Sequence, residues 1–212
     1  MSELSDVSAD LNRLLSVVGQ EAIQDIENKQ FSNYLSLLLR WNARVNLTAV
    51  RDPLAILSRH FVESIAVARA LPRQIASLLD FGSGAGLPGI PIAICRPSLA
   101  VTLAESQSKK AAFLNEAVRT LGLNARVHSA RAETLGENFS CVTLRAVDHM
   151  ELAVRTASEL VAPSGWLAPL TTHAELAAIQ SAAGPGFTWS TPTPLPNSDQ
   201  RILALARRQP SV

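Results

Sequence analysis

The 212-residue sequence predicts an α/β protein whose mostly parallel seven-stranded sheet carries helices on both faces, a late antiparallel hairpin and a helical N-terminal extension. Two observations predict this class. From about residue 77, short apolar runs alternate with helix-like stretches, the pattern of parallel strands joined by helices. Before residue 71, apolar residues recur at the spacing of one helix face. We therefore expect an extension, residues 1–70, packed on a core, residues 71–212.

Three helices are expected in the extension. Leu11, Leu14, Leu15 and Val18 line one face of the first, and residues 31–39 repeat this spacing. A third helix begins after Pro53, because proline suits the first helical turn.

Seven strands are expected in the core. The first five are followed by a tail rich in Pro, Gly and Thr, in which two short strands form the antiparallel hairpin. The clearest helix covers residues 107–121 and ends at Gly122. The expected strands are residues 77–81, 99–104, 125–129, 140–145, 165–170, 187–189 and 201–206.

Composition excludes several classes of protein. Two distant cysteines cannot build a disulfide scaffold or a cysteine zinc site, and four scattered histidines lack metal-binding spacing, so we expect no metal. No apolar run reaches the roughly 18 residues that span a bilayer. The acidic, polar N-terminus is not a signal peptide. We expect a cytoplasmic monomer that does not bind membranes.

The net charge of +1 hides an uneven distribution. Residues 1–39 are mainly acidic, whereas residues 40–73 hold six arginines against Asp52 and Glu63. Arginine matches phosphate geometry, so this segment permits an anionic partner. Charge alone is equally compatible with solvated helix faces.

The most informative stretch is a glycine-rich turn at residues 80–89. A strand ends in Asp80, turns on Gly82, Gly84 and Gly86, and enters a helix. Glycines allow positive φ and close approach of a ligand, and the helix start offers free N–H groups. A tight turn without any ligand is the simpler alternative.

Two cofactors compete for this turn. Gly84, Gly86 and Gly89 match the dinucleotide pattern GxGxxG, which suits a nicotinamide-dependent oxidoreductase. In that fold, however, the first glycine follows the strand directly. Here a carboxylate, Asp80, ends the strand, and Glu105 closes the next one. This pair suits S-adenosylmethionine, because one acid accepts from the cofactor amine and the other bridges the ribose hydroxyls.

Six sequence blocks then occur in a fixed order. They are WN with NLT (residues 41–42 and 46–48), RH (59–60), DFGSGAGLPGIP (80–91), KKAAFL (109–114), RAE (131–133) and RAV (145–147). Together they resemble the small-subunit ribosomal RNA guanine-N7 methyltransferase G family, also called glucose-inhibited division protein B. The resemblance runs from about residue 35 to the C-terminus, and its rarest part is the LPGIP continuation of the glycine turn.

This resemblance implies a class I, Rossmann-like methyltransferase fold. It also implies methyl transfer from S-adenosylmethionine to N7 of a guanine in 16S ribosomal RNA, with S-adenosylhomocysteine as product. The RNA partner would lie within the small subunit or an assembly intermediate. The implied cofactor contacts are Asp80, Gly82, Gly84, Gly86, Leu87, Glu105, Ala132 and Glu133. The candidate RNA contacts are Arg59, His60, Lys109, Lys110, Arg145 and Arg201.

Several positions depart from the family pattern. Glu63 stands where the family has Asp-Ser after the histidine, and Ser58 replaces a glutamate before it. Residues 169–172, Pro-Leu-Thr-Thr, replace a Lys-Gly that usually ends the strand. The cofactor half of the pattern therefore transfers more completely than the RNA-facing half.

The implied chemistry needs no general base, because guanine N7 carries a lone pair and no proton. Arg145 is expected at the mouth of the active site, where it orients the guanine through O6 or a neighbouring phosphate. His60 is expected to be a hydrogen-bonded packing residue, and Trp41 and Phe61 are expected in the core.

Three other functions remain open from the residues alone. They are a methyltransferase acting on a small molecule or a protein, the nicotinamide-dependent oxidoreductase, and a non-catalytic RNA-binding module. Binding of S-adenosylmethionine against NADH separates the oxidoreductase from the methyltransferases.

Overall fold

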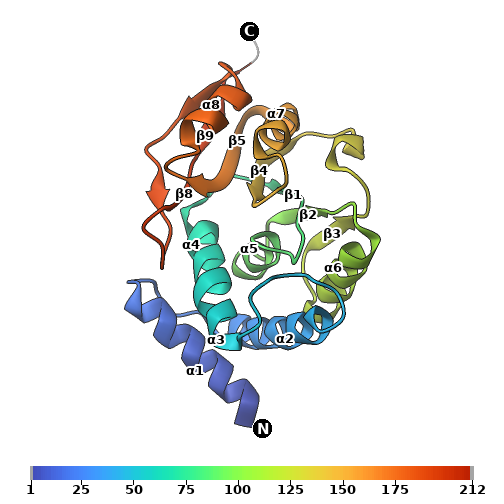
Figure 1. The fold of residues 1–212 in the computed structure, drawn as a ribbon, viewed down its shortest axis with the longest axis vertical. Helices are drawn as coiled ribbons and strands as arrows, with labels where there is room; N and C mark the ends of the chain where they lie inside the picture. The colour runs from blue at the N-terminus through green and yellow to red at the C-terminus, as the bar shows by residue number, and fades with distance from the viewer. Residues whose placement is uncertain (1, 211–212) are drawn as a thin grey trace.

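A computed structural model describes residues 2–210 and shows a nine-stranded sheet between layers of helices (Figure 1). The strands are β1 (Ser77–Phe81), β2 (Ala100–Ala104), β3 (Ala125–His128), β4 (Phe139–Arg145), β5 (Val161–Thr172), β6 (Phe187–Trp189), β7 (Thr193–Pro194), β8 (Arg201–Leu203) and β9 (Ala206–Arg208). The α-helices are α1 (Ser2–Val17), α2 (Asp25–Asn42), α3 (Pro53–Ile56), α4 (Val62–Ala70), α5 (Gly89–Cys95), α6 (Ser108–Leu121), α7 (Met150–Glu159) and α8 (Leu176–Ala183). A π-helical segment, η1 (Leu57–Phe61), joins α3 to α4, and a 3-10 turn, η2 (Ala132–Leu135), follows β3.

The sheet reverses its direction of winding beside β1. Its order is β3-β2-β1-β4-β5-β8-β7, and the first five of these strands are parallel. The chain winds outward from β1 in one direction through β2 and β3, and in the other through β4 and β5. Ligands of open α/β sheets bind at such a switch point, outside the carboxyl ends of the strands. Here those ends are Phe81 and Arg145.

The strand expected at residues 187–189 is confirmed as β6, an additional short strand, β7, follows it, and the strand expected at residues 201–206 is divided into β8 and β9. β8 and β9 lie along β5 in a single antiparallel register, with Leu170 opposite Leu203 and Leu167 opposite Ala206. Between these pairs, the Ala204 amide donates to the Pro169 carbonyl at 3.1 Å. Pro169 has no N–H to return that bond, so the ladder is interrupted there. The seven positions of the sheet are confirmed, and the single strand expected over residues 201–206 is corrected to two segments.

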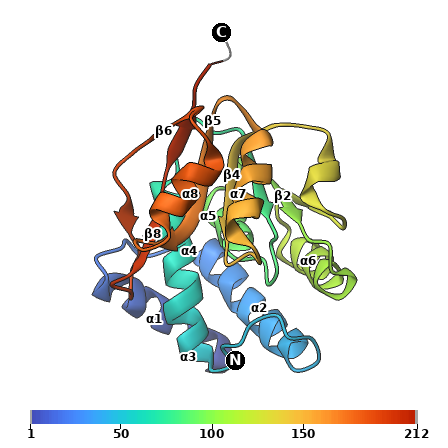
Figure 2. The same ribbon diagram turned by 45° about the horizontal axis from the view of Figure 1, so that its top comes forward.

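Helices cover both faces of the sheet, each with its own apolar cluster. α7 and α8 lie together over one face, where Val154 and Ile179 are buried (Figure 2). On the other face α4 packs on α5, and α2 packs on α5 and α6. One apolar cluster there joins Phe31 and Ile65 of the N-terminal helices to Leu78 of β1. The boundary at residue 70 stays a prediction.

The third N-terminal helix begins as expected, at Pro53. The side chain of Asp52 caps it by accepting a hydrogen bond from the Ala55 amide at 2.7 Å. The helix then widens into the π-segment η1, which carries Arg59 and His60. Such π-turns inside α-helices are frequent at functional sites.

Among residues 2–210, no helix is long and apolar enough to cross a membrane.

One tyrosine connects the N-terminal helices to the glycine turn. Tyr34 is fully buried in α2, and its ring stacks on Phe61 with ring centroids 4.9 Å apart. Its hydroxyl donates to the carbonyl of Ala85, within the glycine turn, at 2.6 Å. Burial raises the pKa of this phenol well above its usual value, so the hydroxyl keeps its proton and remains a donor.

We expect Tyr34→Phe to lower the free energy of unfolding by about 1 kcal/mol. The phenylalanine ring keeps the stacking on Phe61, but the buried carbonyl of Ala85 loses its donor. Urea titration monitored by circular dichroism measures the change. An unchanged unfolding curve would show that the hydroxyl does not hold the glycine turn.

Candidate active site

A cavity of about 390 Å³ lies at the carboxyl ends of β1 and β4. This volume falls within the range of small-molecule sites. One wall comes from the glycine turn and the start of α6. The opposite wall comes from the loop after α2, from η1 and from the end of β4. The lining residues include Leu47, Thr48, His60, Gly82, Gly84, Leu87, Glu105, Gln107, Lys110, Arg145 and Val147.

The glycines of the turn serve different purposes. Gly82, Gly84 and Gly86 all have positive φ, at 71°, 55° and 83°. A Cβ on Gly86 would lie 2.4 Å from Ile90, so packing excludes a side chain there. A Cβ on Gly84 would meet nothing closer than a carbonyl at 3.9 Å. Gly84 therefore leaves open space in the cavity wall.

Asp80 lies beneath the glycine turn and does not line the cavity. It is fully buried, and its Oδ2 accepts from the Gly89 amide at 3.2 Å. A Cβ on Gly89 would lie 2.6 Å from this oxygen, which explains the glycine. Its Oδ1 is buried without a partner in residues 2–210. Burial raises the pKa of Asp80 to about 7.

Glu105 connects the two loops that follow β1 and β2. Only 6% of its surface is exposed, yet it lines the cavity. Its Oε2 accepts from the Gly84 amide at 3.0 Å, and its Oε1 accepts from the Gln107 amide at 2.7 Å. Because a carboxylate oxygen has two lone pairs, each oxygen can accept one further hydrogen bond.

Asn42 holds the loop that forms the opposite wall. Its Oδ1 accepts from the amides of Leu47 and Thr48, at 2.9 and 3.1 Å. Its Nδ2 donates to the Thr48 carbonyl at 3.0 Å. These bonds explain the spacing between the WN and NLT blocks, a role that the sequence analysis did not assign.

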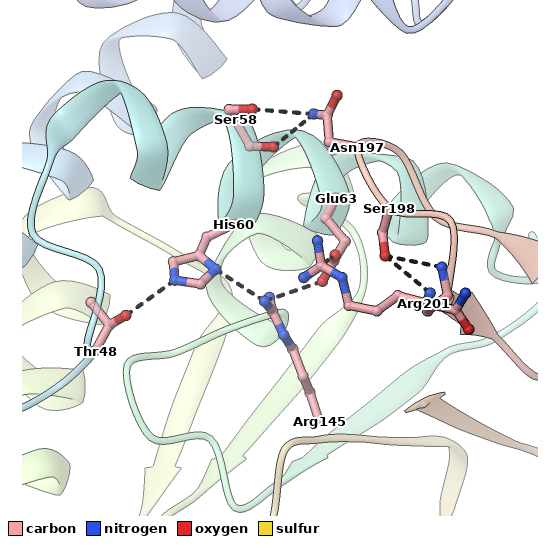
Figure 3. A network of polar contacts seen from close by, with 9 residues as sticks. Thr48, Ser58, His60, Glu63, Arg145, Asn197, Ser198 and Arg201 are labelled. Carbon is pink, nitrogen blue, oxygen red and sulfur yellow. Dashed lines mark hydrogen bonds and ion pairs between the residues drawn. The ribbon is translucent and has the colours of Figure 1, made fainter. Parts of the chain in front are cut away.

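One buried carboxylate pairs with two arginines behind the wall that contains the Asn42 loop (Figure 3). Glu63, on α4, is 1% exposed and pairs with Arg145 at 3.2 Å and with Arg201 at 2.7 Å. Arg145 ends β4 and its side chain is only 13% exposed. Burial raises the pKa of Glu63, and the two guanidinium groups oppose that rise. Neither the charge distribution nor the departure from the family pattern predicts this role of Glu63.

His60 continues this network toward the cavity. Its Nδ1 lies 3.0 Å from Nη2 of Arg145, and its Nε2 lies 3.1 Å from Oγ1 of Thr48. Burial and the charge of Arg145 lower its pKa to about 4. The imidazole is therefore neutral near pH 7, which fits the hydrogen-bonded role predicted from the sequence, although the ring also lines the cavity.

The remaining predicted residues lie at varied distances from the cavity. Gly86 is buried behind its wall, and Arg201 lies behind Glu63. Ala132 is buried in η2, next to the exposed Glu133. Neither of these two lines the cavity. Arg59 and Lys109 are exposed beside it, next in sequence to His60 and Lys110, which do line it.

The two aromatic residues that the sequence predicts in the core differ in burial. Phe61 is fully buried, whereas Trp41 is half-buried and donates from Nε1 to Glu116 at 2.8 Å. Within residues 2–210, no three His, Cys, Asp or Glu side chains gather where they could hold a metal ion.

Comparison with known proteins identifies the family. Residues 27–182 match the model of the family described as rRNA small subunit methyltransferase G. The chain belongs to this family. A ribosomal RNA small subunit methyltransferase G from Xanthomonas oryzae pv. oryzae is 44% identical over 182 residues, which cover 82% of each protein. One from Stenotrophomonas maltophilia is 47% identical over 152 residues, 69% of this chain and 71% of its own.

Solved structures confirm the fold. A SAM-dependent methyltransferase from Aquifex aeolicus superposes with a TM-score of 0.61 at 14% identity, over 77% of this chain and 97% of its own. TrmN from Thermus thermophilus gives a TM-score of 0.55 at 20% identity, over 72% and 53%. The Rossmann-like methyltransferase fold implied by the family resemblance is thus confirmed.

We expect His60 to make the protein less stable in acid. The folded state binds this proton near pH 4 and the unfolded chain near 6.5, so unfolding takes up a proton between these values. The contribution of neutral His60 to the free energy of unfolding is fully present above about pH 6.5 and is lost as the pH falls toward 4. Urea unfolding across this window, for wild type and His60→Gln, measures the effect. The difference between the two proteins should change with pH, and a constant difference would contradict the assignment.

Proposed function

We propose that this protein transfers a methyl group from S-adenosylmethionine to N7 of a guanine in 16S ribosomal RNA, within the small subunit or an assembly intermediate. The main support for this proposal is a cavity that has the glycine turn and Glu105 on one wall and the Arg145–His60 pair on the other. Membership of the methyltransferase G family supports the same function.

The residues around the glycine turn suit S-adenosylmethionine. This cofactor is cationic and has no phosphate, so carboxylates replace the usual anion site. We expect Glu105, which lines the cavity, to accept from the ribose hydroxyls. Oδ1 of Asp80 has no partner in the described part of the chain but is buried behind the cavity wall, so it would accept from the cofactor's amino group through water or after a shift of the turn. Gly82, Gly84, Gly86 and Leu87 would form the cradle, with Ala132 and Glu133 toward the adenine. When bound, the cofactor supplies an activated methyl group on sulfur.

The chain itself supplies positioning. Guanine N7 needs no deprotonation, so no base is required, and the alignment of nucleophile, methyl and sulfur can contribute about 7 to 11 kcal/mol. Arg145 is suited to orient the guanine, because Glu63 and His60 both hold its Nη2 and its Nη1 has no partner within residues 2–210. It cannot act as a base.

The proposed RNA surface surrounds the cavity mouth. Lys110 and His60 line the cavity, and Arg59 and Lys109 are exposed beside them. Arg201 would act mainly by holding Glu63. We further propose that residues 1–70 act as an extension that supports the glycine turn through Tyr34, and that the protein works in the cytoplasm as a monomer without a metal or a membrane.

The decisive experiment compares ribosomal RNA from cells with and without this protein. Mass spectrometry of 16S RNA should show one N7-methylguanosine that disappears with the gene and returns on complementation. The purified protein should then methylate small subunits from the deficient cells. If the 16S RNA is unchanged and the protein methylates a small molecule or another protein, RNA is not the substrate.

We expect Gly84→Val to abolish binding of S-adenosylmethionine, because the valine side chain would occupy the open space at Gly84. For the wild type, ligand at about 100 times its Kd should add about 2.7 kcal/mol of stability, measured as a rise in Tm. Gly122→Val is the matched control, since Gly122 has a similar φ of 62° and no atom within 4 Å of its Cβ position. It should lose stability through strain and keep the ligand-induced rise.

We expect Arg145→Ala to raise the barrier to methyl transfer by about 2 to 4 kcal/mol and to leave S-adenosylmethionine affinity nearly intact. Arg145→Lys should recover part of the rate, because it keeps the charge without the planar fork. Single-turnover kinetics and calorimetry measure the two quantities. At saturating cofactor, the wild-type rate should be flat from about pH 6 to 9, since no base takes part. A bell-shaped profile would overturn this assignment.

A further inference from the structure

The polar network behind the cavity ends at a hydroxyl group that the proposed mechanism does not use. It runs from Arg201 through Glu63, Arg145 and His60 to Thr48 (Figure 3). Thr48 lines the cavity together with His60 and Arg145. The direction in which its hydroxyl donates follows from the rest of the network.

The arginine determines which nitrogen of His60 carries the proton. Arg145 has only donors, so Nδ1 of His60 must accept its hydrogen bond at 3.0 Å. The neutral ring then carries its hydrogen on Nε2. That nitrogen lies 3.1 Å from Oγ1 of Thr48 and donates to it.

The Thr48 hydroxyl can therefore act only as a donor toward any further partner. It accepts from His60 and also from the Val50 amide, at 3.1 Å. A hydroxyl has two lone pairs, and both are now occupied. Its hydrogen has no acceptor within residues 2–210 at hydrogen-bond distance. The network therefore holds one oriented, unused donor at the wall that faces the glycine turn.

We propose that the Thr48 hydroxyl donates to O6 of the target guanine and determines the choice of base. This inference rests on the proposed function. The major-groove edge of guanine offers two acceptors, N7 and O6, whereas adenine offers N7 and the N6 amino donor. A donor at O6 leaves N7 free for the methyl group. An adenine would place its amino group against the hydroxyl and leave a donor unpaired, which costs binding energy.

This assignment also divides the work between the two side chains. Arg145 is left to contact an adjacent phosphate and to hold His60 in the tautomer that orients Thr48. Thr48 is the residue that reads the base. The NLT block of the sequence thus has a chemical purpose beyond the backbone contacts with Asn42.

The test removes the hydroxyl and, separately, the O6 atom. Once the methylated guanine is mapped, small subunits are reconstituted with guanine or 2-aminopurine at that position; 2-aminopurine keeps N7 and lacks O6. Thr48→Val should slow methylation of guanine about 10-fold, the equivalent of one hydrogen bond, and slow that of 2-aminopurine less than about 2-fold. Thr48→Ser should keep most of the rate on guanine.

Equal losses on both bases, or no loss on guanine, would overturn the assignment. Tm and S-adenosylmethionine affinity report whether a variant is folded, and Thr48→Ala replaces Thr48→Val if the latter is not. Ser58→Ala is the control, because Ser58 lies on the π-segment that carries His60, contacts Asn197 and does not line the cavity. Failure of the wild type to methylate guanine would instead refute the proposed function, so the two failures are distinguishable.

Discussion

The active site depends on a single buried carboxylate. Glu63 pairs with Arg145 and Arg201, and these three residues come from α4, β4 and β8. Two unpaired guanidinium groups at this depth would be strongly unfavourable, and breaking a buried pair costs about 3 to 5 kcal/mol. The carboxylate therefore ties together an N-terminal helix, a central strand and the C-terminal hairpin. Without it, only the hydrogen bond to His60 would fix the orientation of Arg145.

The N-terminal helices form part of the site rather than a cover for it. They supply Glu63, His60 and the loop held by Asn42, and so build one wall of the cavity. Through the Tyr34 hydroxyl they also hold the carbonyl of Ala85, in the opposite wall. The same buried layer of N-terminal helices therefore contacts both walls of the cavity. This arrangement suits a reaction to which alignment of the reacting groups can contribute about 7 to 11 kcal/mol.

The electrostatics of the cavity match a nucleophile without a proton. The histidine that lines it is kept neutral by burial and by the arginine beside it, and the arginine cannot take up a proton. Acidic groups lie on both sides of the cavity: Glu105 lines it beside the glycine turn, above the buried Asp80, and Asp148 lines it from the loop after β4. In the proposed mechanism, Glu105 faces the cofactor, and Arg145 and Thr48 face the RNA.

The main helices and strands in their order, the glycine turn and the carboxylates at two strand ends could all be predicted from the sequence, because local spacing encodes backbone conformation and burial. The sequence also placed the chain in its family. No sequence pattern predicted that Glu63 pairs with Arg145, that Thr48 contacts His60, or that Pro169 interrupts the pairing of the last strands; these follow from the folded chain. Those pairings join residues that are distant along the chain. Their geometry follows from strand register and helix packing, which no local pattern contains.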